Sequence, residues 1–541
     1  MLGLFQNASE VPGIGSGRFV LFFSLFNAAL FQWPLYRLAL STRAAFDGSS
    51  VLALSTLFVF QLTISMTLLG LCALASIRLL KAICAMFSVA NAAALYFIVQ
   101  YGVVLDATMV GNVVNTNVRE ASELAHPVLL AYILVLGVLP AALLLRLPVR
   151  ASSRLRRSGV VALSLVAGSL WLYANAQSWL WIDKNAKAFG GLILPWSYVI
   201  NTVRYYKSEA ERHRVAEPLP PITGNRPGGM VFVLVIGEAA RAQNFSLYGY
   251  ARDTNPQLRG DGVVVYPDAR SCATYTTAAL RCMLSYKGAD GISGNDEPLP
   301  SYFQRHGVEV IWRTNNFGEP PLKVGRYDTA DAIRKACKQD CALLDYDDVL
   351  LHGMEQLLRN GKPDSKTLIV LHQGGSHGPQ YARKYPLGFE RFKPTCGSVE
   401  LQKCSASELV NAYDNTILYT DDILHRVIQM LKSVRDRPSA MLYISDHGES
   451  LGEGGLYLHG VPMALAPEVQ FTVPLLAWTS DEFVRRGGRL KDPQHIDIKL
   501  SQDMIFHSVM GAMGLRSTVY VPAKDLFRFT PPASEAGNNK E

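Results

Sequence analysis

Acidic and imidazole side chains follow several short apolar segments in the second half of the chain. They are Glu238 after VFVLVIG, His372 and His377 in LHQGGSH, Asp446 and His447 after SAMLYIS, and His459 in YLHG. A mixed set of carboxylates and imidazoles suits zinc, which takes nitrogen and oxygen ligands. A single acid at a strand end is more often a capping residue, so the prediction of a metal site depends on the whole set.

A second group of reactive side chains lies in SCATYTTAALRCMLS. Its hydroxyls, Thr274, Thr276 and Thr277, come just before a helical stretch of small residues. A hydroxyl at a helix N-terminus is commonly only an N-cap. The same geometry directs backbone N–H groups and the positive end of the helix dipole toward a phosphate. Coordination to Zn²⁺ would lower the pKa of such a hydroxyl and give an alkoxide able to attack phosphorus.

The segments that carry these residues have the pattern of an α/β domain. VFVLVIGE, VEVIWRTNN, KTLIVLHQ and SAMLYISDHGE read as buried strands, and amphipathic segments such as ELVNAYDNTILYTDDILHRVIQMLKSV separate them. Short apolar strands that alternate with helices indicate a mostly parallel sheet. Open sheets of this kind carry their sites at the carboxyl ends of the strands, where the polar residues stand.

The first third of the chain is apolar and predicts a membrane domain. Five stretches approach the roughly 20 residues needed to cross a bilayer. They run from Phe19 to Leu40, Val51 to Ile77, Leu80 to Val103, Pro127 to Leu147 and Val160 to Trp181. The first has no small-residue cleavage site and continues with Gln32, Trp33 and Pro34, so it reads as a retained helix.

Charges in the short loops predict the orientation. Five arginines and no acidic residue lie between positions 146 and 157, and cytoplasmic loops retain such positive charge. Arg78 and Lys81 agree, whereas the loop from Asp106 to Glu123 should face outward. An odd number of spans then places everything after Trp181 outside the cytoplasm.

Six of the eight cysteines come as close pairs. The pairs are Cys272 and Cys282, Cys337 and Cys341, and Cys396 and Cys404. Six cysteines formally allow 15 pairings, and local closure is the simplest. No pair has the C-x2-C partner set of a zinc site, so disulfides in an oxidising compartment fit better. A Cys272–Cys282 bridge would brace the threonine loop.

The sequence divides into four parts. Residues 1–181 are the predicted transmembrane domain, 182–224 an amphipathic connector, 225–530 an extracytoplasmic α/β catalytic domain, and 531–541 a disordered tail. The apolar part of the connector suits either an interfacial helix on the membrane or an ordinary linker helix. The net charge of +7 forms no basic stripe, so nucleic-acid binding is not expected.

Four sequence blocks resemble a known family. They are VLVIGEAARAQNFSLYGYARDTNP, SCATYTTAALRCMLS, GSHGPQYARKYP and SDHGESLGEGGLYLHGVPMALAP. They look like the signature blocks of the lipid A phosphoethanolamine transferases, which include the mobile colistin-resistance enzymes. That family belongs to the alkaline phosphatase and sulfatase superfamily. The resemblance covers nearly the whole chain and implies five transmembrane helices followed by a sulfatase-like soluble domain.

The resemblance also implies roles for individual residues. The family's zinc ligands fall on Glu238, Thr276, Asp446 and His447. Thr276 becomes the nucleophile, which carries phosphoethanolamine in the intermediate. His377 and His459 match family residues that contact the phosphoryl group or a second zinc. The implied mechanism is ping-pong, and one of these two histidines handles the proton.

A loop after the third span matches a family segment that helps to bind the lipid donor. In NVVNTNVRE it places Asn112, Thr116 and Glu120 near the ethanolamine end, where a carboxylate would pair with the ammonium group. Without the resemblance, this loop would read as a solvated turn. The expected donor is phosphatidylethanolamine and the expected acceptor is lipopolysaccharide, foremost a lipid A phosphate. The family context implies a monomer in the Gram-negative inner membrane with its catalytic domain in the periplasm.

Two departures from the family pattern leave the acceptor open. WRTNNFGEP has Phe317 and Glu319 where many relatives carry an extra cysteine pair, and Arg281 stands where relatives commonly have proline. Transfer to a Kdo or heptose of the core, or to a periplasmic glucan, is therefore an alternative.

Three rival functions are weaker on sequence grounds. A sulfatase needs a C-x-P-S-R or S-x-P-S-R segment, which is absent. A phosphoglycerol transferase would share five spans and a threonine nucleophile, but the three cysteine pairs and TYTTAALRCMLS argue against it. A non-catalytic lipid-binding membrane protein would not need to retain every proposed ligand.

Overall fold

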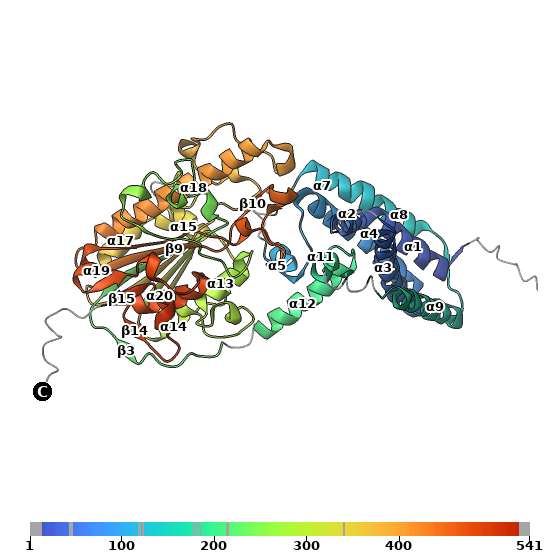
Figure 1. The fold of residues 1–541 in the computed structure, drawn as a ribbon, viewed down its shortest axis with the longest axis horizontal. Coiled ribbons are helices and arrows are strands. Elements are labelled where there is room, and N and C mark those ends of the chain that lie inside the picture. Colours follow the sequence, from blue (N-terminus) through green and yellow to red (C-terminus); the bar gives the residue numbers. More distant parts are fainter. Residues whose placement is uncertain are drawn as a thin grey trace, which may run out of the picture. The chain divides into compact units, whose positions relative to one another are not determined.

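The computed structural model describes residues 13–42, 47–116, 121, 124–176, 178, 181–182, 185–212, 216–338 and 341–529. Contacts divide the chain into two compact units (Figure 1). The membrane unit contains Met1–Val110 and Ala125–Arg204, and the soluble unit contains Gly111–Leu124 and Tyr205–Glu541. The division therefore falls inside the predicted connector, and the predicted tail lies outside the described residues.

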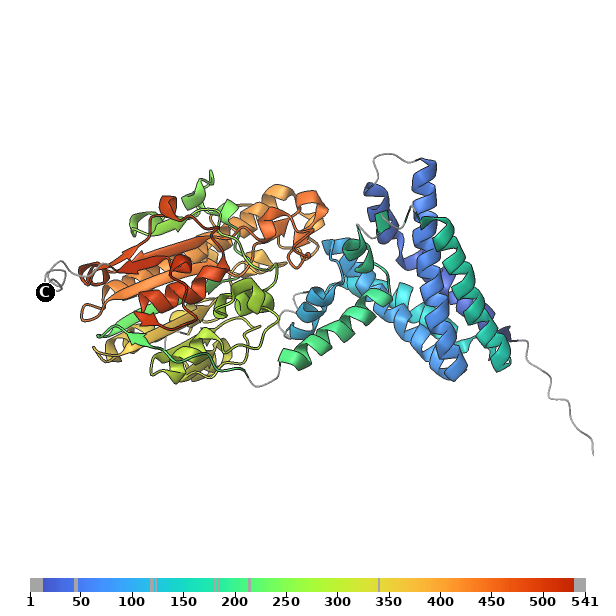
Figure 2. The ribbon, with the colours of Figure 1, turned by 60° about the horizontal axis from the view of Figure 1, so that its bottom comes forward.

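The membrane unit consists of long apolar helices. They are α1 (Ser16–Phe31), α2 (Trp33–Ser41), α3 (Gly48–Ala75), α4 (Ile77–Tyr101), the continuous α7, η1 and α8 (Pro127–Arg146), and α9 (Arg154–Ala174). Among the described residues, four helices are long and apolar enough to cross a membrane, or five if the bent pair α1 and α2 is one span. The last four stand side by side (Figure 2). The predicted helical membrane region is confirmed.

Two predicted spans differ from the observed helices. The stretch from Phe19 to Leu40 is broken between α1 and α2, with a bend of 56°. Pro34 lies in the first turn of α2 and cannot donate the N–H that a continuous helix would need, which explains the break. The last span begins at Arg154 instead of Val160, because the Ser153 hydroxyl caps it, and it ends at Ala174.

The connector contains α11 (Ala186–Gly190) and α12 (Trp196–Arg212). Its beginning is fixed within the membrane unit by polar contacts. The buried amides of Asn27 and Gln32 both donate to the carbonyl of Leu194, at 2.7 and 2.5 Å. The indole of Trp196 donates to the Ser65 hydroxyl at 2.9 Å. This end of α12 is therefore held by packed helices, and its placement at a membrane surface stays a prediction.

The soluble unit is built around a seven-stranded sheet. Its order is β5 (Val264–Tyr266), β12 (Leu475–Thr479), β9 (Ser439–Ser445), β4 (Met230–Gly237), β8 (Lys366–His372), β6 (Glu309–Thr314) and β7 (Arg326–Thr329). Strand β12 runs antiparallel to both of its neighbours, β5 and β9, and the other strand pairs of this sheet are parallel. The predicted α/β class is confirmed, and the four predicted strands are the adjacent β9, β4, β8 and β6. Three short strands, β5, β7 and β12, have no clear signal in the sequence.

Helices cover both faces of this sheet (Figure 1). One face packs against α13 (Thr276–Leu284), α14 (Leu299–Arg305) and α20 (Ile505–Ala512), and the other against α15 (Ala330–Ala336), α17 (Met354–Asn360) and α18 (Ala406–Lys432). Strand β4 is buried along its whole length. Its Phe232 and Leu234 belong to the first core, and its Val231 and Val233 belong to the second. Burial on both faces explains why β4 is continuously apolar in the sequence.

Gly237 at the end of β4 supplies a stability test. A Cβ atom at this position would lie 2.5 Å from the hydroxyl of Tyr443, which is fully buried on the neighbouring β9. We expect Gly237→Ala to destabilise the soluble unit by about 1–3 kcal/mol through overpacking. Thermal unfolding of the detergent-solubilised chain measures the effect. Gly388→Ala is the matched control, because a Cβ there meets no atom within 4 Å; equal unfolding temperatures for the two variants would contradict the expectation.

Candidate active site

Thr276 is the first residue of α13, and its hydroxyl faces the end of β4. The Oγ1 atom donates to Glu238 Oε2 at 3.1 Å and lies 3.5 Å from His447 Nε2. The N-cap of α13 is Tyr275, whose side chain makes no capping bond. By contrast, the Thr274 hydroxyl donates to the Val461 carbonyl at 2.6 Å. The hydroxyl at 276 is thus directed toward a carboxylate instead of capping its helix.

Two carboxylates and one imidazole complete this cluster. His447 Nε2 lies 3.2 Å from Glu238 Oε1 and 3.3 Å from Asp446 Oδ2, and all three side chains are buried. Four tetrahedral ligands at zinc distances of 2.0–2.1 Å would be separated by about 3.3 Å. Four contacts are of this size: Thr276 to Glu238 Oε2, Thr276 to His447, His447 to Glu238 Oε1 and His447 to Asp446, at 3.1–3.5 Å.

The hydrogen bonding of the cluster also fits a bound cation. Glu238 Oε1 and Asp446 Oδ2 are buried and have no hydrogen-bond partner in the part of the chain that the structure describes. His447 Nδ1 donates to the carbonyl of Gly448 at 2.9 Å, and Nε2 faces the two carboxylates. Most metal-binding histidines are oriented in this way, by a hydrogen bond from the ring nitrogen that does not face the metal. These residues therefore fit a zinc ion.

The electrostatics of the cluster favour positive charge. Burial by itself would lower the pKa of His447, but the neighbouring Asp446 and Glu238 carboxylates raise it to about 10. Burial and the charge of Glu238 raise the pKa of Asp446 to about 7. Two carboxylates this close in a dry site disfavour each other's charge. A divalent cation at this point would compensate both.

His459 and His377 lie beside the cluster. The ring of His459 is centred 4.2 Å from that of His447 and 5.1 Å from that of His377. Burial lowers the pKa of His377 to about 4 and that of His459 to about 3. His459 Nδ1 lies 3.3 Å from the buried Glu449, whose pKa burial raises to about 8. Both imidazoles are neutral near pH 7 and can bind a metal or accept a proton.

His372 does not join this set, although it ends β8. Its Nδ1 atom lies 2.9 Å from Glu319 Oε1 and 3.2 Å from the Thr314 hydroxyl. Burial by itself would lower the pKa of His372, but Glu319 and, more weakly, the charges of Asp446 and Glu238 raise it. His372 is therefore a neighbour of the cluster. The reason is tertiary, since Glu319 lies beyond the next strand and meets His372 only in the folded sheet.

The predicted donor-binding residues lie in and after α5 (Ala107–Asn115). Thr116 donates its hydroxyl to the carbonyl of Asn112 at 2.7 Å, as a residue at a helix end commonly does. Glu120 lies outside the described residues. The role of this segment stays a prediction from the resemblance.

Two functional side chains were missed in the sequence. Asn316 follows β6 and donates to Glu238 Oε2 at 2.7 Å and to the Gln373 carbonyl at 3.0 Å. Its strand-end position was a usable signal. Gln502 donates to the carbonyl of Asp446 at 2.6 Å and accepts from the amide of Cys272 at 2.9 Å. No local pattern marks Gln502, because both of its partners are distant in sequence.

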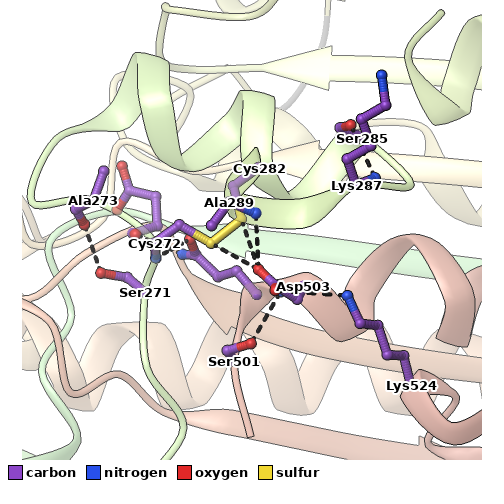
Figure 3. The surroundings of a disulfide bond; sticks show 12 residues. Ser271, Cys272, Ala273, Cys282, Ser285, Lys287, Ala289, Ser501, Asp503 and Lys524 are labelled. Carbon is purple, nitrogen blue, oxygen red and sulfur yellow. Dashed lines mark hydrogen bonds and ion pairs between the residues drawn. A yellow bond between two sulfur atoms is a disulfide. The ribbon is translucent and has the colours of Figure 1, made fainter. Parts of the chain in front are cut away.

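The threonine loop is braced by the Cys272–Cys282 disulfide (Figure 3). Asp503, next to Gln502, lies 3.3 Å from both sulfur atoms and accepts from the Ala289 amide at 3.0 Å. The two cysteines and Asp503 do not form a metal site, because disulfide sulfurs offer no thiolate. The other two bridges join Cys337 to Cys341 and Cys396 to Cys404, so all three pairs close locally as expected.

Known proteins are similar to this chain in both sequence and fold. The Sulfatase family profile matches residues 231–515, and the profile for phosphoethanolamine transferase EptA/EptB matches residues 62–210. The chain is 36% identical to phosphoethanolamine transferase EptA of Helicobacter pylori, over 94% of this chain and 96% of the relative. It is 34% identical to phosphatidylethanolamine transferase Mcr-1 of Escherichia coli, over 78% and 84% of the two chains. The structure of lipooligosaccharide phosphoethanolamine transferase A (EptA) from Neisseria meningitidis matches with a TM-score of 0.87 and 30% identity, over 96% of this chain and all of that one.

The disulfide beside Thr276 can be tested against a distant one. Replacing Cys272 and Cys282 together by serine releases a bridge of sequence separation 10 and should cost about 3 kcal/mol of stability. The matched control removes Cys337 and Cys341, with separation 4, and should cost about 2 kcal/mol. Turnover of a phosphodiester should fall only in the first variant, because only that bridge holds the Thr276 loop. Equal activity in both variants would contradict the bracing role.

Proposed function

Because this chain belongs to the lipid A phosphoethanolamine transferase family, we propose that it transfers phosphoethanolamine from phosphatidylethanolamine to a lipopolysaccharide acceptor through Thr276. The observation that carries the proposal is the direction of one hydroxyl. Thr276 Oγ1 lies between Glu238 and His447 at the N-terminus of a buried helix. A hydroxyl, a nearby base and helix N–H groups are the parts that a phosphoryl-transfer nucleophile needs.

In the first half-reaction, Thr276 Oγ1 attacks the phosphorus of the donor. A bond forms between that oxygen and phosphorus, and the bond from phosphorus to the glycerol oxygen breaks. The threonine proton passes to a base, for which Glu238 Oε2 is suitably close at 3.1 Å. Diacylglycerol leaves as the alcohol after its oxygen takes up the proton that Glu238 received from Thr276.

In the second half-reaction, an oxygen of the acceptor attacks the threonine ester. The bond from phosphorus to Thr276 Oγ1 breaks, and the free hydroxyl returns. Burial lowers the pKa of His377 and of His459, so both rings are neutral at pH 7. One of them accepts the proton of the attacking P–OH or sugar hydroxyl and passes it to Thr276 Oγ1. The amides at the start of α13 stabilise charge on the phosphoryl oxygens throughout.

Glu238, Thr276, Asp446 and His447 would hold zinc, which would lower the pKa of the threonine hydroxyl and stabilise charge on the phosphoryl oxygens. Asn112, Thr116 and Glu120 would receive the ethanolamine end of the donor. The resemblance alone supports this second assignment.

The acceptor and the location complete the proposal. A lipid A phosphate is the proposed acceptor. The lipooligosaccharide transferase among the structural relatives supports the broader class of acceptor. The soluble unit would face the periplasm from the inner membrane. The arginine-rich loop before α9 and the three disulfides support that orientation. We propose a monomer.

Mass spectra of lipid A, core oligosaccharide and periplasmic glucans test the reaction. A Gram-negative host that expresses the wild-type chain should gain a phosphoethanolamine increment on lipid A, and Thr276→Ala should abolish it. Thr277→Ala removes the adjacent hydroxyl and should retain the increment. Cells whose lipid A carries the increment should be less susceptible to polymyxin, because the added ammonium group offsets the charge of the phosphate. An increment only on core sugars or glucans would contradict the acceptor, and an increment that survives Thr276→Ala would contradict the nucleophile.

Metal analysis tests the ligand set. The purified wild-type chain should contain zinc, and Asp446→Ala should lose most of it together with transfer activity. Exposed Asp364→Ala is the matched control and should retain both. A chelator should inactivate the wild-type enzyme, and added zinc should restore it. Full zinc content in Asp446→Ala would contradict the assignment of Asp446 as a zinc ligand.

A further inference from the structure

A short loop beside the nucleophile exposes apolar side chains. The 462–467 loop has the sequence PMALAP, and from Gly460 to Pro467 the chain has no charged or hydrogen-bonding side chain. Met463 and Leu465 are each 43% exposed on the soluble unit. Single exposed apolar residues are ordinary, but two of them on one turn, with Ala464 also exposed between them, form a small continuous apolar tip.

The base of this loop is attached to the threonine loop. Gly460 donates its amide to the Thr274 carbonyl at 2.8 Å, and the Thr274 hydroxyl donates to the Val461 carbonyl at 2.6 Å. The Val461 amide donates to Gln470 Oε1 at 3.2 Å. The apolar tip is therefore held in a fixed relation to Thr276, which lies two residues after Thr274.

The turn itself is closed by its own backbone. The amides of Leu465 and Ala466 both donate to the Pro462 carbonyl, at 2.7 and 3.0 Å. With their N–H groups bonded, these residues can enter an apolar medium without leaving donors unpaired. The exposed tip thus has aliphatic side chains, and two of its amides are already bonded, which lowers the cost of contact with hydrocarbon.

We propose that the 462–467 loop dips into the surface of a phospholipid bilayer and so presents Thr276 at the depth of lipid phosphates. The inference rests on the proposed function, in which both substrates are lipids. Protein-binding surfaces are enriched in tryptophan, tyrosine and arginine, whereas this tip carries only methionine, leucine, alanine and proline. Aliphatic side chains without charge match acyl chains better than they match a protein partner.

Fluorescence quenching tests the contact directly. The full chain, with Cys72 and Cys84 replaced by serine, is labelled at Met463→Cys with an environment-sensitive dye and reconstituted in bilayers of phosphatidylethanolamine and phosphatidylglycerol. Spin-labelled lipids should quench the dye at 463. The matched control is Leu387→Cys, because Leu387 is 85% exposed on the same unit. Equal quenching at the two positions, or none at 463, would overturn the proposal.

Kinetics with two donors test the consequence. Met463→Glu combined with Leu465→Glu should raise KM for long-chain phosphatidylethanolamine in bilayers roughly tenfold. It should leave turnover of dihexanoyl phosphatidylethanolamine, below its micelle concentration, unchanged. Leu387→Glu should alter neither. Equal losses on both donors, or no loss on either, would overturn the proposal.

The two tests separate failure of the loop from failure of the proposed function. If the wild-type chain transfers nothing from either donor, the proposed function fails. The quenching measurement does not depend on turnover, so it would still decide whether the loop enters the bilayer.

Discussion

The structure of the soluble unit depends on two carboxylates that are buried side by side. Glu238 and Asp446 lie at the ends of adjacent parallel strands, and both face His447 within 3.3 Å. Charges in such a dry place are costly unless a cation compensates them. The surrounding polar groups, among them Asn316 and Gln502, orient the cluster without supplying that charge. With its pKa raised to about 10, His447 supplies one positive charge for the two carboxylates. A divalent cation would balance both carboxylates, which is the strongest physical argument for a metal.

The parallel direction of the strands brings the two carboxylates and His447 together. Parallel strands β9, β4, β8 and β6 end at the same edge, so residues separated by about 200 positions come together there. This explains why the chemistry could be predicted from sequence. Glu238, Asp446 and His447 directly follow apolar runs, and a parallel sheet leaves few other places for them. The proposed nucleophile could be narrowed by pattern only to three threonines, because the start of their helix was visible in the sequence but the direction of each hydroxyl was not.

Contacts between distant segments and the short strands of the sheet could not be predicted from the sequence. Gln502 joins the Asp446 carbonyl to the Cys272 amide, and such a bridge has no sequence periodicity. The short edge strands carry too few residues to show an alternation. In the membrane unit, hydropathy located the apolar stretches but could not show that Gln32 donates to Leu194 at the break between α1 and α2. Hydropathy measures a local average, whereas these features arise from single polar contacts between distant segments.

The departures from the family pattern acquire a physical meaning in the same way. Many relatives carry a cysteine pair after the NN motif, whereas this chain has Glu319 there. Its carboxylate contacts His372 Nδ1 and accepts from the Trp312 indole, both of them buried. The same loop carries Asn316, which donates to Glu238. A buried ion pair can therefore fasten the loop in place of a covalent bridge, provided that both partners stay.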